Sequence, residues 1–167
     1  MRGKEQSAML SQDFKELLSA FNRHRVKYLI VGGYAVALHA QPRATKDLDL
    51  FVGSDSANAR AVFAALAEFG APLEGLNPED FFDPNSFFRM GTAPQMVEII
   101  PRISGVDFDH AWKRRVEEVI DENSGLKAHF ISADDFLTNK IAAGRPQDLA
   151  DSEAVKRAAK ARSRAKR

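Results

Sequence analysis

Two short stretches of sequence decide the fold: YLIVGG at residues 28–33 and DLDLFV at residues 47–52, separated by thirteen residues. The first predicts a short buried strand over residues 26–31, which ends at the glycine pair. The second predicts another strand over residues 47–52. Residues 34–40 are mostly apolar and predict a short helix between the strands, ended by Pro42. The centre of the chain is therefore expected to run strand, glycine turn, helix, strand.

The second stretch places two carboxylates on one face of its strand. Alternate side chains of a strand share a face, so Asp47 and Asp49 point one way while Leu48 and Leu50 point into the core. The two aspartate Cα atoms are then about 6.6 Å apart. Two negative charges at that separation repel by about 2.5 kcal/mol at an effective dielectric constant near 20. A divalent cation reverses this interaction, and carboxylate oxygens suit Mg²⁺.

A third carboxylate is expected from Glu98, in the apolar run MVEII at residues 96–100. In a central strand, Glu98 would be a further metal ligand; in an edge strand, it would face water. The motif Asp47-Leu-Asp49 also has a plain alternative, a polar strand face at a sheet edge. The glycine pair upstream favours the metal site over that alternative.

The glycine pair, Gly32 and Gly33, follows a strand and opens a helix. Glycines permit close backbone approach, and the amides at a helix N-terminus favour anions, so a triphosphate fits this turn. A tight strand-to-helix turn without a ligand is the alternative. The pattern matches neither the dinucleotide-binding glycine fingerprint nor the Walker loop.

The rest of the chain predicts further helices and strands in mixed order, which indicates an α/β or α+β fold with one small sheet. Capping residues and apolar periodicity support the helices, and short apolar runs support the strands. The predicted helices span residues 12–25, 55–69, 108–118 and 132–143, with a last helix capped by Asp148. The predicted strands span residues 86–90, 95–100 and 126–131, the first two forming a hairpin around residues 91–94.

Composition sets the broad class. The chain has 167 residues, 44% of them hydrophobic and 28% charged, which suits one globular domain. It has no cysteine, which excludes disulfides, thiolate zinc sites and cysteine nucleophiles. The N-terminal sequence has no apolar signal region, so a cytoplasmic location is expected.

The charge is unevenly distributed. Residues 156–167 carry seven Lys or Arg and no acid, so the net charge of +1 leaves the remaining residues at +1 − 7 = −6. Such a basic tail contacts nucleic acid in some proteins and is a solvated helix end in others. Both interpretations stay open at this stage.

These motifs resemble the nucleotidyltransferase superfamily that shares its fold with DNA polymerase beta. Its pattern is a hydrophobic residue, a Gly-Gly or Gly-Ser pair, about a dozen residues, and Asp-hydrophobic-Asp. RATKD at residues 43–47 is similar to a motif of small bacterial members and AbiEii-type toxins. Downstream, the matching positions are Lys140, Arg145, Asp148 and Asp151, although Asp148 and Asp151 fit a helix capping box equally well.

The resemblance implies a mixed sheet flanked by helices, in a single domain over residues 1–155 followed by the basic tail at 156–167. It also implies two Mg²⁺ ions and transfer of a nucleoside monophosphate from an NTP. The metal ligands and catalytic residues implied are Asp47, Asp49 and Glu98. The nucleotide-binding residues implied are Gly32, Gly33, Arg43, Thr45 and Lys140, with Lys140 on the triphosphate.

Two departures from the family pattern bear on function. Glu98 stands where an aspartate is more frequent, and the extra C-terminal helical domain of the larger toxins is missing. An acceptor-binding part is then either absent or supplied by a partner protein.

The acceptor stays open. The leading hypothesis is transfer to a hydroxyl of RNA or protein, related to toxin–antitoxin systems. The alternatives are transfer to a small hydroxylated molecule and a non-catalytic binding subunit that keeps the fold. The four histidines have no metal-ligand spacing, and no Ser-His-Asp arrangement is evident.

Overall fold

The computed structural model describes residues 10–41, 45, 47–92 and 95–166, and its centre is a six-stranded mixed sheet. The strand order is β3-β4-β2-β1-β6-β5. The β1–β6 and β2–β4 pairs are parallel, and the other three pairs are antiparallel. The α/β fold expected from the sequence is confirmed. The strands are β1 (Tyr28–Val31), β2 (Asp47–Val52), β3 (Phe88–Thr92), β4 (Gln95–Ile100), β5 (Val116–Asp121) and β6 (Leu126–Phe130).

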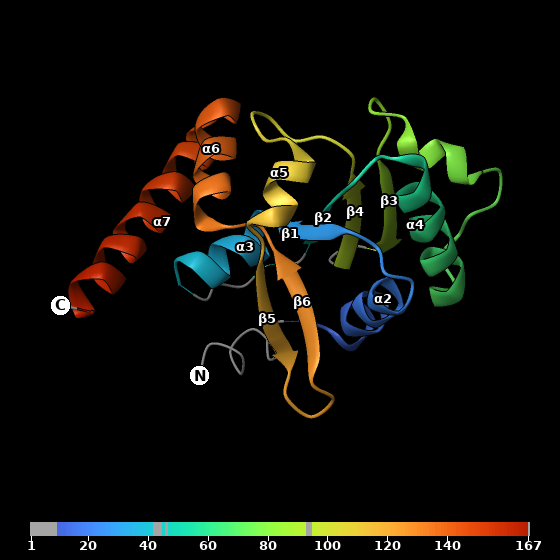
Figure 1. The fold of residues 1–167 in the computed structure, drawn as a ribbon, viewed down its shortest axis with the longest axis horizontal. Helices are drawn as coiled ribbons and strands as arrows, with labels where there is room; N and C mark the ends of the chain where they lie inside the picture. The colour runs from blue at the N-terminus through green and yellow to red at the C-terminus, as the bar shows by residue number, and fades with distance from the viewer. Residues whose placement is uncertain (1–9, 42–44, 46, 93–94, 167) are drawn as a thin grey trace.

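Helices cover both faces of this sheet (Figure 1). Helices α2 and α4 pack against each other on one side, whereas α5, α6 and α7 lie on the other. The bounds are α2 (Gln12–Arg23), α3 (Gly32–His39), α4 (Ser56–Phe69), η1 (a 3-10 helix, Pro78–Phe82), α5 (Phe108–Lys113), α6 (Ala133–Ala143) and α7 (Pro146–Ala165). No helix in the described ranges is long and apolar enough to cross a membrane.

Helix α2 begins where the sequence predicts and ends two residues earlier. The Ser11 side chain accepts a hydrogen bond from the Phe14 amide, and the apolar stripe of the helix is buried. Arg25 then takes a left-handed conformation, with φ +56°. The Arg25 and Val26 amides donate to the carbonyls of Asn22 and Phe21, which closes the helix as a Schellman motif.

The sheet separates two hydrophobic clusters. Leu48, Leu50 and Val52 of β2 pack on the side of α2 and α4. Phe51 of the same strand packs against Phe108 on the opposite side, with ring centroids 5.0 Å apart. Because β2 alternates its side chains, Asp47 and Asp49 share the face of Phe51. The carboxylates therefore lie on the side of α5 and α6.

One predicted helix is wrong in its second half. The prediction ran over residues 108–118, but α5 ends at Lys113 and Val116–Asp121 forms β5, which pairs antiparallel with β6. Val116, Val119 and Ile120 follow a helical spacing as well as they suit a strand. Their pairing with β6 decides the outcome, and that pairing leaves no local signal.

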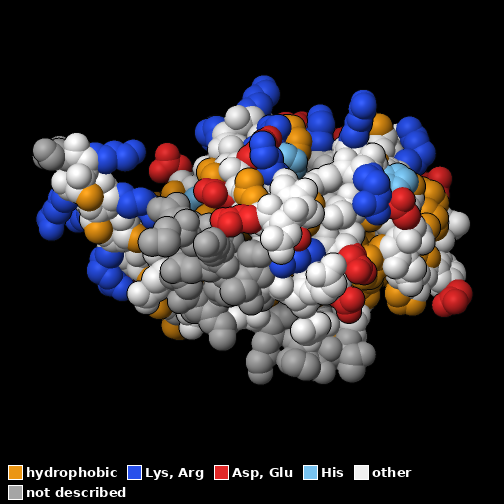
Figure 2. All heavy atoms as spheres, turned by 90° about the horizontal axis from the view of Figure 1, so that it is seen from below, with side chains coloured by type: hydrophobic (Ala, Val, Ile, Leu, Met, Phe, Trp, Pro, Cys, Tyr) orange, Lys and Arg blue, Asp and Glu red, His pale blue; other side chains and the backbone are white. Residues whose placement is uncertain are grey.

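The predicted capping residues are confirmed for α6 but not for α7. Ser132 accepts from the Asp135 amide at the start of α6, and Gly144 ends that helix with φ +68°. Asp148 is not the N-cap of α7; the N-cap is Arg145, and Asp148 is the third helical residue, which accepts from the Arg145 amide. Helix α7 continues through residue 156, and Lys and Arg side chains gather on its projecting end (Figure 2).

Candidate functional site

The site begins with the pairing of β2 and β4. In this parallel pair Asp49 lies opposite Glu98, and Asp47 lies opposite Met96. Asp47, Asp49 and Glu98 therefore project from the same face of neighbouring strands. Strand β4 is flanked by β3 and β2, so Glu98 belongs to an interior strand and not to an edge.

Gly32 lies directly against the Asp49 carboxylate. A Cβ atom at Gly32 would fall 2.2 Å from Asp49 Oδ2, and the backbone there has φ +69°. The left-handed backbone favours glycine, and any side chain at this position would displace the Asp49 carboxylate. Asp49 reaches this position because β1 pairs with β2 so that Val31 lies opposite it.

Gly33 makes a similar close contact with Thr45. A Cβ atom at Gly33 would meet the Thr45 hydroxyl oxygen at 2.4 Å. Tyr34 also contacts this residue, because its hydroxyl donates a hydrogen bond to the Thr45 carbonyl at 3.3 Å. The first turn of α3 therefore contacts Thr45 through two consecutive residues.

The electrostatics of Asp49 reflect this crowding. Its pKa is raised from 3.8 to about 6, first by burial and then by the negative charges of Glu98 and Asp47. A hydrogen bond with the Glu98 carboxyl raises the pKa further, because it needs a proton between the two groups. The Lys140 charge acts in the opposite direction, which places Lys140 near Asp49.

Glu98 has a second partner that the sequence did not reveal. Arg89 of β3 lies opposite it, with Nε 3.6 Å from Glu98 Oε1. The predicted hairpin turn at residues 91–94 would set Arg89 against Met96. Strand β3 instead continues to Thr92, and this shifts the pairing by two residues.

Lys140 lies in a charged network of its own. Its ammonium is 3.2 Å from Asp148 Oδ1, and Arg145 Nε is 2.7 Å from Asp148 Oδ2. The Asp148 side chain is 2% exposed. Arg145, first, and then Lys140 lower the Asp148 pKa to about 2 by hydrogen bonding to its charged form. The chain of contacts from Arg145 through Asp148 to Lys140 links the start of α7 to the site.

The structure thus brings together seven of the eight residues expected at the site. These are Gly32, Gly33, Thr45, Asp47, Asp49, Glu98 and Lys140. Arg43 lies outside the described residues, as do Pro42 and Lys46.

The donor set suits a hard divalent cation in chemistry, since it consists of carboxylates that repel one another. Within the described residues, however, no group of three His, Cys, Asp or Glu side chains is arranged to hold a metal ion as it stands. Glu98 instead contacts Arg89, which agrees with the absence of such a three-residue group.

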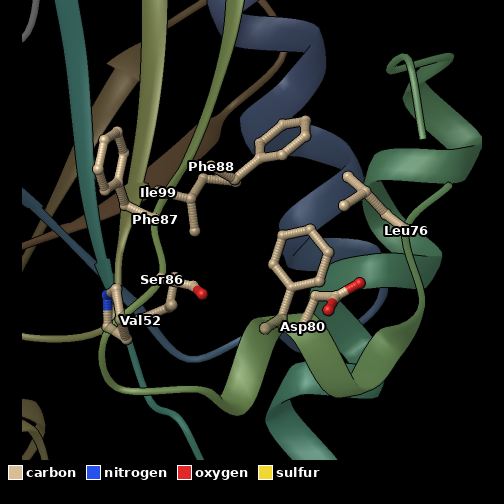
Figure 3. A pocket seen from close by; sticks show the side chains of 9 residues that line it. Val52, Leu76, Asp80, Ser86, Phe87, Phe88 and Ile99 are labelled. Carbon is tan, nitrogen blue, oxygen red and sulfur yellow. The ribbon is translucent and has the colours of Figure 1, made fainter. Parts of the chain in front are cut away.

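An apolar pocket lies elsewhere, among η1, β3 and β4 (Figure 3). Its lining includes Val52, Phe81, Phe88 and Ile99. Val52 and Ile99 project from the sheet face opposite the carboxylates, which follows from the alternation along β2 and β4. This pocket is therefore separate from the candidate site.

The six-stranded mixed sheet, with a glycine turn against an Asp-hydrophobic-Asp strand, is consistent with a nucleotidyltransferase-like fold. The chain belongs to the family described as nucleotidyltransferase of unknown function (DUF6036), which it matches over residues 6–158. A comparison with curated proteins gave no match. The membership supports a transferase in general terms.

Proposed function

We propose that this chain is a Mg²⁺-dependent nucleotidyltransferase that moves a nucleoside monophosphate from an NTP to a hydroxyl group. The observation that carries the proposal is Asp49, gathered with Glu98 and Asp47 against the Gly32 turn, with its pKa raised to about 6. A carboxylate crowded by two others at a glycine turn costs stability unless a cation offsets the repulsion. That cost supports a role in binding.

Asp47, Asp49 and Glu98 would hold the metal. Bound there, Mg²⁺ supplies charge neutralisation of the phosphates and of the attacking oxygen. Glu98 first has to leave Arg89, which then has its guanidinium free for a phosphate oxygen.

The chain's own residues hold the NTP and move the proton. The amides at the glycine turn and the Lys140 ammonium bind phosphate oxygens. The acceptor oxygen attacks the α-phosphorus in line, the bond from that phosphorus to the bridging oxygen breaks, and pyrophosphate leaves. Glu98 accepts the proton of the acceptor hydroxyl. Positioning and charge neutralisation supply most of the rate in such chemistry.

The acceptor in this proposal is RNA or a protein, in a toxin–antitoxin setting like that of the AbiEii-type toxins. The basic end of α7 favours RNA, because the remaining residues carry a net charge of −6 and repel a polyanion. The activity is placed in the cytoplasm, where NTPs are available.

Label transfer tests the activity. The purified chain is incubated with each α-labelled NTP, Mg²⁺ and either total RNA or candidate partner proteins. Labelled RNA or protein is expected with the wild type and not with Asp47→Asn/Asp49→Asn. NTP binding without transfer to any acceptor would favour the non-catalytic binding subunit, and label on a small hydroxylated compound would favour the small-molecule transferase.

Variants separate chemistry from binding. Asp49→Ala is expected to lower kcat by about 100-fold or more while changing NTP affinity little. Lys140→Ala is expected to weaken NTP binding first, with Lys156→Ala as a control of equal charge change. Unchanged NTP affinity in Lys140→Ala, in a variant that remains folded by circular dichroism, would remove Lys140 from its role.

Mg²⁺ is expected to raise the melting temperature of the wild type and not of Asp47→Asn/Asp49→Asn, because the ion binds only the gathered carboxylates. An equal shift in both proteins would contradict the metal assignment.

A further inference from the structure

A separate cleft lies at the opposite end of β1 from the carboxylates. Its volume is about 350 Å³, and it lies where the end of α2, the start of β1, α5 and β6 meet. Its lining consists of Asn22, Arg25, Val26, Lys27, Trp112 and His129.

This cleft is distinct from the candidate active site. Lys27 precedes the first residue of β1, whereas Gly32 follows the last one. Five residues of extended chain separate them, or roughly 16 Å at 3.3 Å per residue. A phosphate bound at the glycine turn does not reach this cleft.

Two cations of the cleft lack a counter-charge. Arg25 and Lys27 are exposed, and within the described parts of the chain neither side chain forms an ion pair. No acidic residue lines the cleft itself, and Asp55 lines the neighbouring pocket that Arg25 and Lys27 also border. Unpaired neighbouring cations repel each other. Such a pair is unexpected in a chain whose residues outside the tail carry a net charge of −6.

The backbone under both cations is fixed. The buried Asn58 side chain accepts from the Lys27 amide at 2.8 Å and donates to the Lys27 carbonyl at 3.0 Å. Arg25 occupies the left-handed position of the Schellman motif, where glycine is preferred. An arginine there costs about 1 kcal/mol of strain, so its side chain is held at an energetic cost.

The opposite wall is aromatic. The Arg115 guanidinium lies 3.9 Å from the Trp112 ring centroid, and His129 packs edge-on to the same ring at 4.9 Å. Arg115 is itself paired with Glu117 at 3.3 Å, so its charge is offset. The Trp112 ring also stacks on Phe108, with ring centroids 6.0 Å apart.

We propose that this cleft binds a phosphate group of a nucleotide, either free or within an RNA strand. Its lining offers two cations, Arg25 and Lys27, that form no ion pair in the described structure. The Asn22 amide donates to the Lys127 carbonyl at 2.7 Å, and the Glu117 carboxylate beside His129 is paired with Arg115. A phosphate has several acceptor oxygens on one centre, so the neighbouring Arg25 and Lys27 can bind it together. The site stands independently of the proposed catalytic activity.

The chain contains a single tryptophan, so its fluorescence reports on this cleft. The purified chain is titrated at low salt with inorganic tripolyphosphate and, separately, with a single-stranded RNA decamer. A saturable change in Trp112 fluorescence that weakens with added salt is expected. A response to both ligands assigns a free phosphate site, and a response to RNA alone assigns a strand-binding site; no response to either overturns the proposal.

Three variants test the residues. Arg25→Gly and Lys27→Gln are each expected to weaken binding about tenfold, the effect of one charge-assisted hydrogen bond. Arg60→Gln removes an exposed cation on α4, away from the cleft, and is expected to leave the curve unchanged. Arg25→Gly also relieves backbone strain, so its loss of binding does not come from unfolding. Wild-type affinity in both cleft variants would overturn the assignment, and Lys140→Ala should leave the Trp112 response intact.

Discussion

Asp49 is held partly out of water beside two other carboxylates, and this has a measurable cost. A folded pKa raised to about 6 means that the folded state holds a proton that the unfolded state releases near 3.8. The stability contributed by this group is therefore complete below about pH 4 and is lost as the pH rises through 6.

The substitution Asp49→Asn removes the loss of stability that the wild type suffers as the pH rises through 6. At pH 7.5 the variant is expected to exceed the wild type in free energy of unfolding by about 1–3 kcal/mol, at about 1.4 kcal/mol per pKa unit. Urea denaturation at pH 7.5 and pH 4 measures the difference, which should shrink at the lower pH. Glu16→Gln, an exposed change on α2, is the control. A variant less stable than the wild type at pH 7.5 would contradict the repulsion argument.

Asp148 shows the opposite behaviour. Its pKa is lowered to about 2, so its stabilising effect is present above about pH 3.8 and is lost as the pH falls toward 2. Asp148→Asn leaves Lys140 nearly buried without its partner. A loss of about 3 kcal/mol in unfolding free energy at pH 7 is expected.

The acid titration distinguishes this pair from a simple packing defect. Between pH 4 and pH 2 the free energy of unfolding of the wild type should fall as Asp148 is protonated. That of Asp148→Asn should not show this fall, because the variant has no carboxylate at this position. Parallel pH profiles for the two proteins would show that the ion pair contributes nothing.

At the scale of elements, the conformation of Arg25 gives a test that is independent of ligands. Arg25→Gly is expected to raise the free energy of unfolding by about 1 kcal/mol, because glycine adopts φ +56° without strain. Gly70 ends α4 with φ +93° and open space around it, so Gly70→Ala should lose a similar amount. Thermal denaturation of both variants measures the two effects; equal melting temperatures would exclude strain at these positions.

Local signals predicted the elements that carry the site. The alternation of DLDLFV and the glycine pair placed β2 and the start of α3, and Asp55 and Gly70 marked the ends of α4. The shared face of Asp47 and Asp49 follows from strand geometry alone.

Pairing between distant segments was beyond those signals. Arg89 meets Glu98 only because β3 pairs two residues further along than the turn sequence suggested. Lys140 reaches Asp49 from a helix whose placement depends on the core between α6 and the sheet. The cleft around Trp112 and Arg25 likewise joins four elements, and nothing in the sequence near either residue indicates it.

At the scale of the whole molecule, the end of α7 is a basic arm on an otherwise acidic protein. Removing residues 162–167 deletes four positive charges and is expected to weaken RNA binding and to flatten its salt dependence. NTP affinity should stay unchanged. Binding curves at two salt concentrations test this, and identical curves for full-length and shortened protein would leave α7 without a role in binding.

The position of β1 in the sheet has a consequence for synthesis on the ribosome. β1 pairs with β2, from which fifteen residues (32–46) separate it along the chain, and with β6, so that Ile30 lies beside Phe130. All four residues of β1 are buried in the finished sheet. While the nascent chain is shorter than about 130 residues, one edge of this apolar strand has no partner, and such edges recruit other chains. Nascent chains halted after Gly125 should therefore bind chaperones or aggregate, whereas chains that extend past α6 should not.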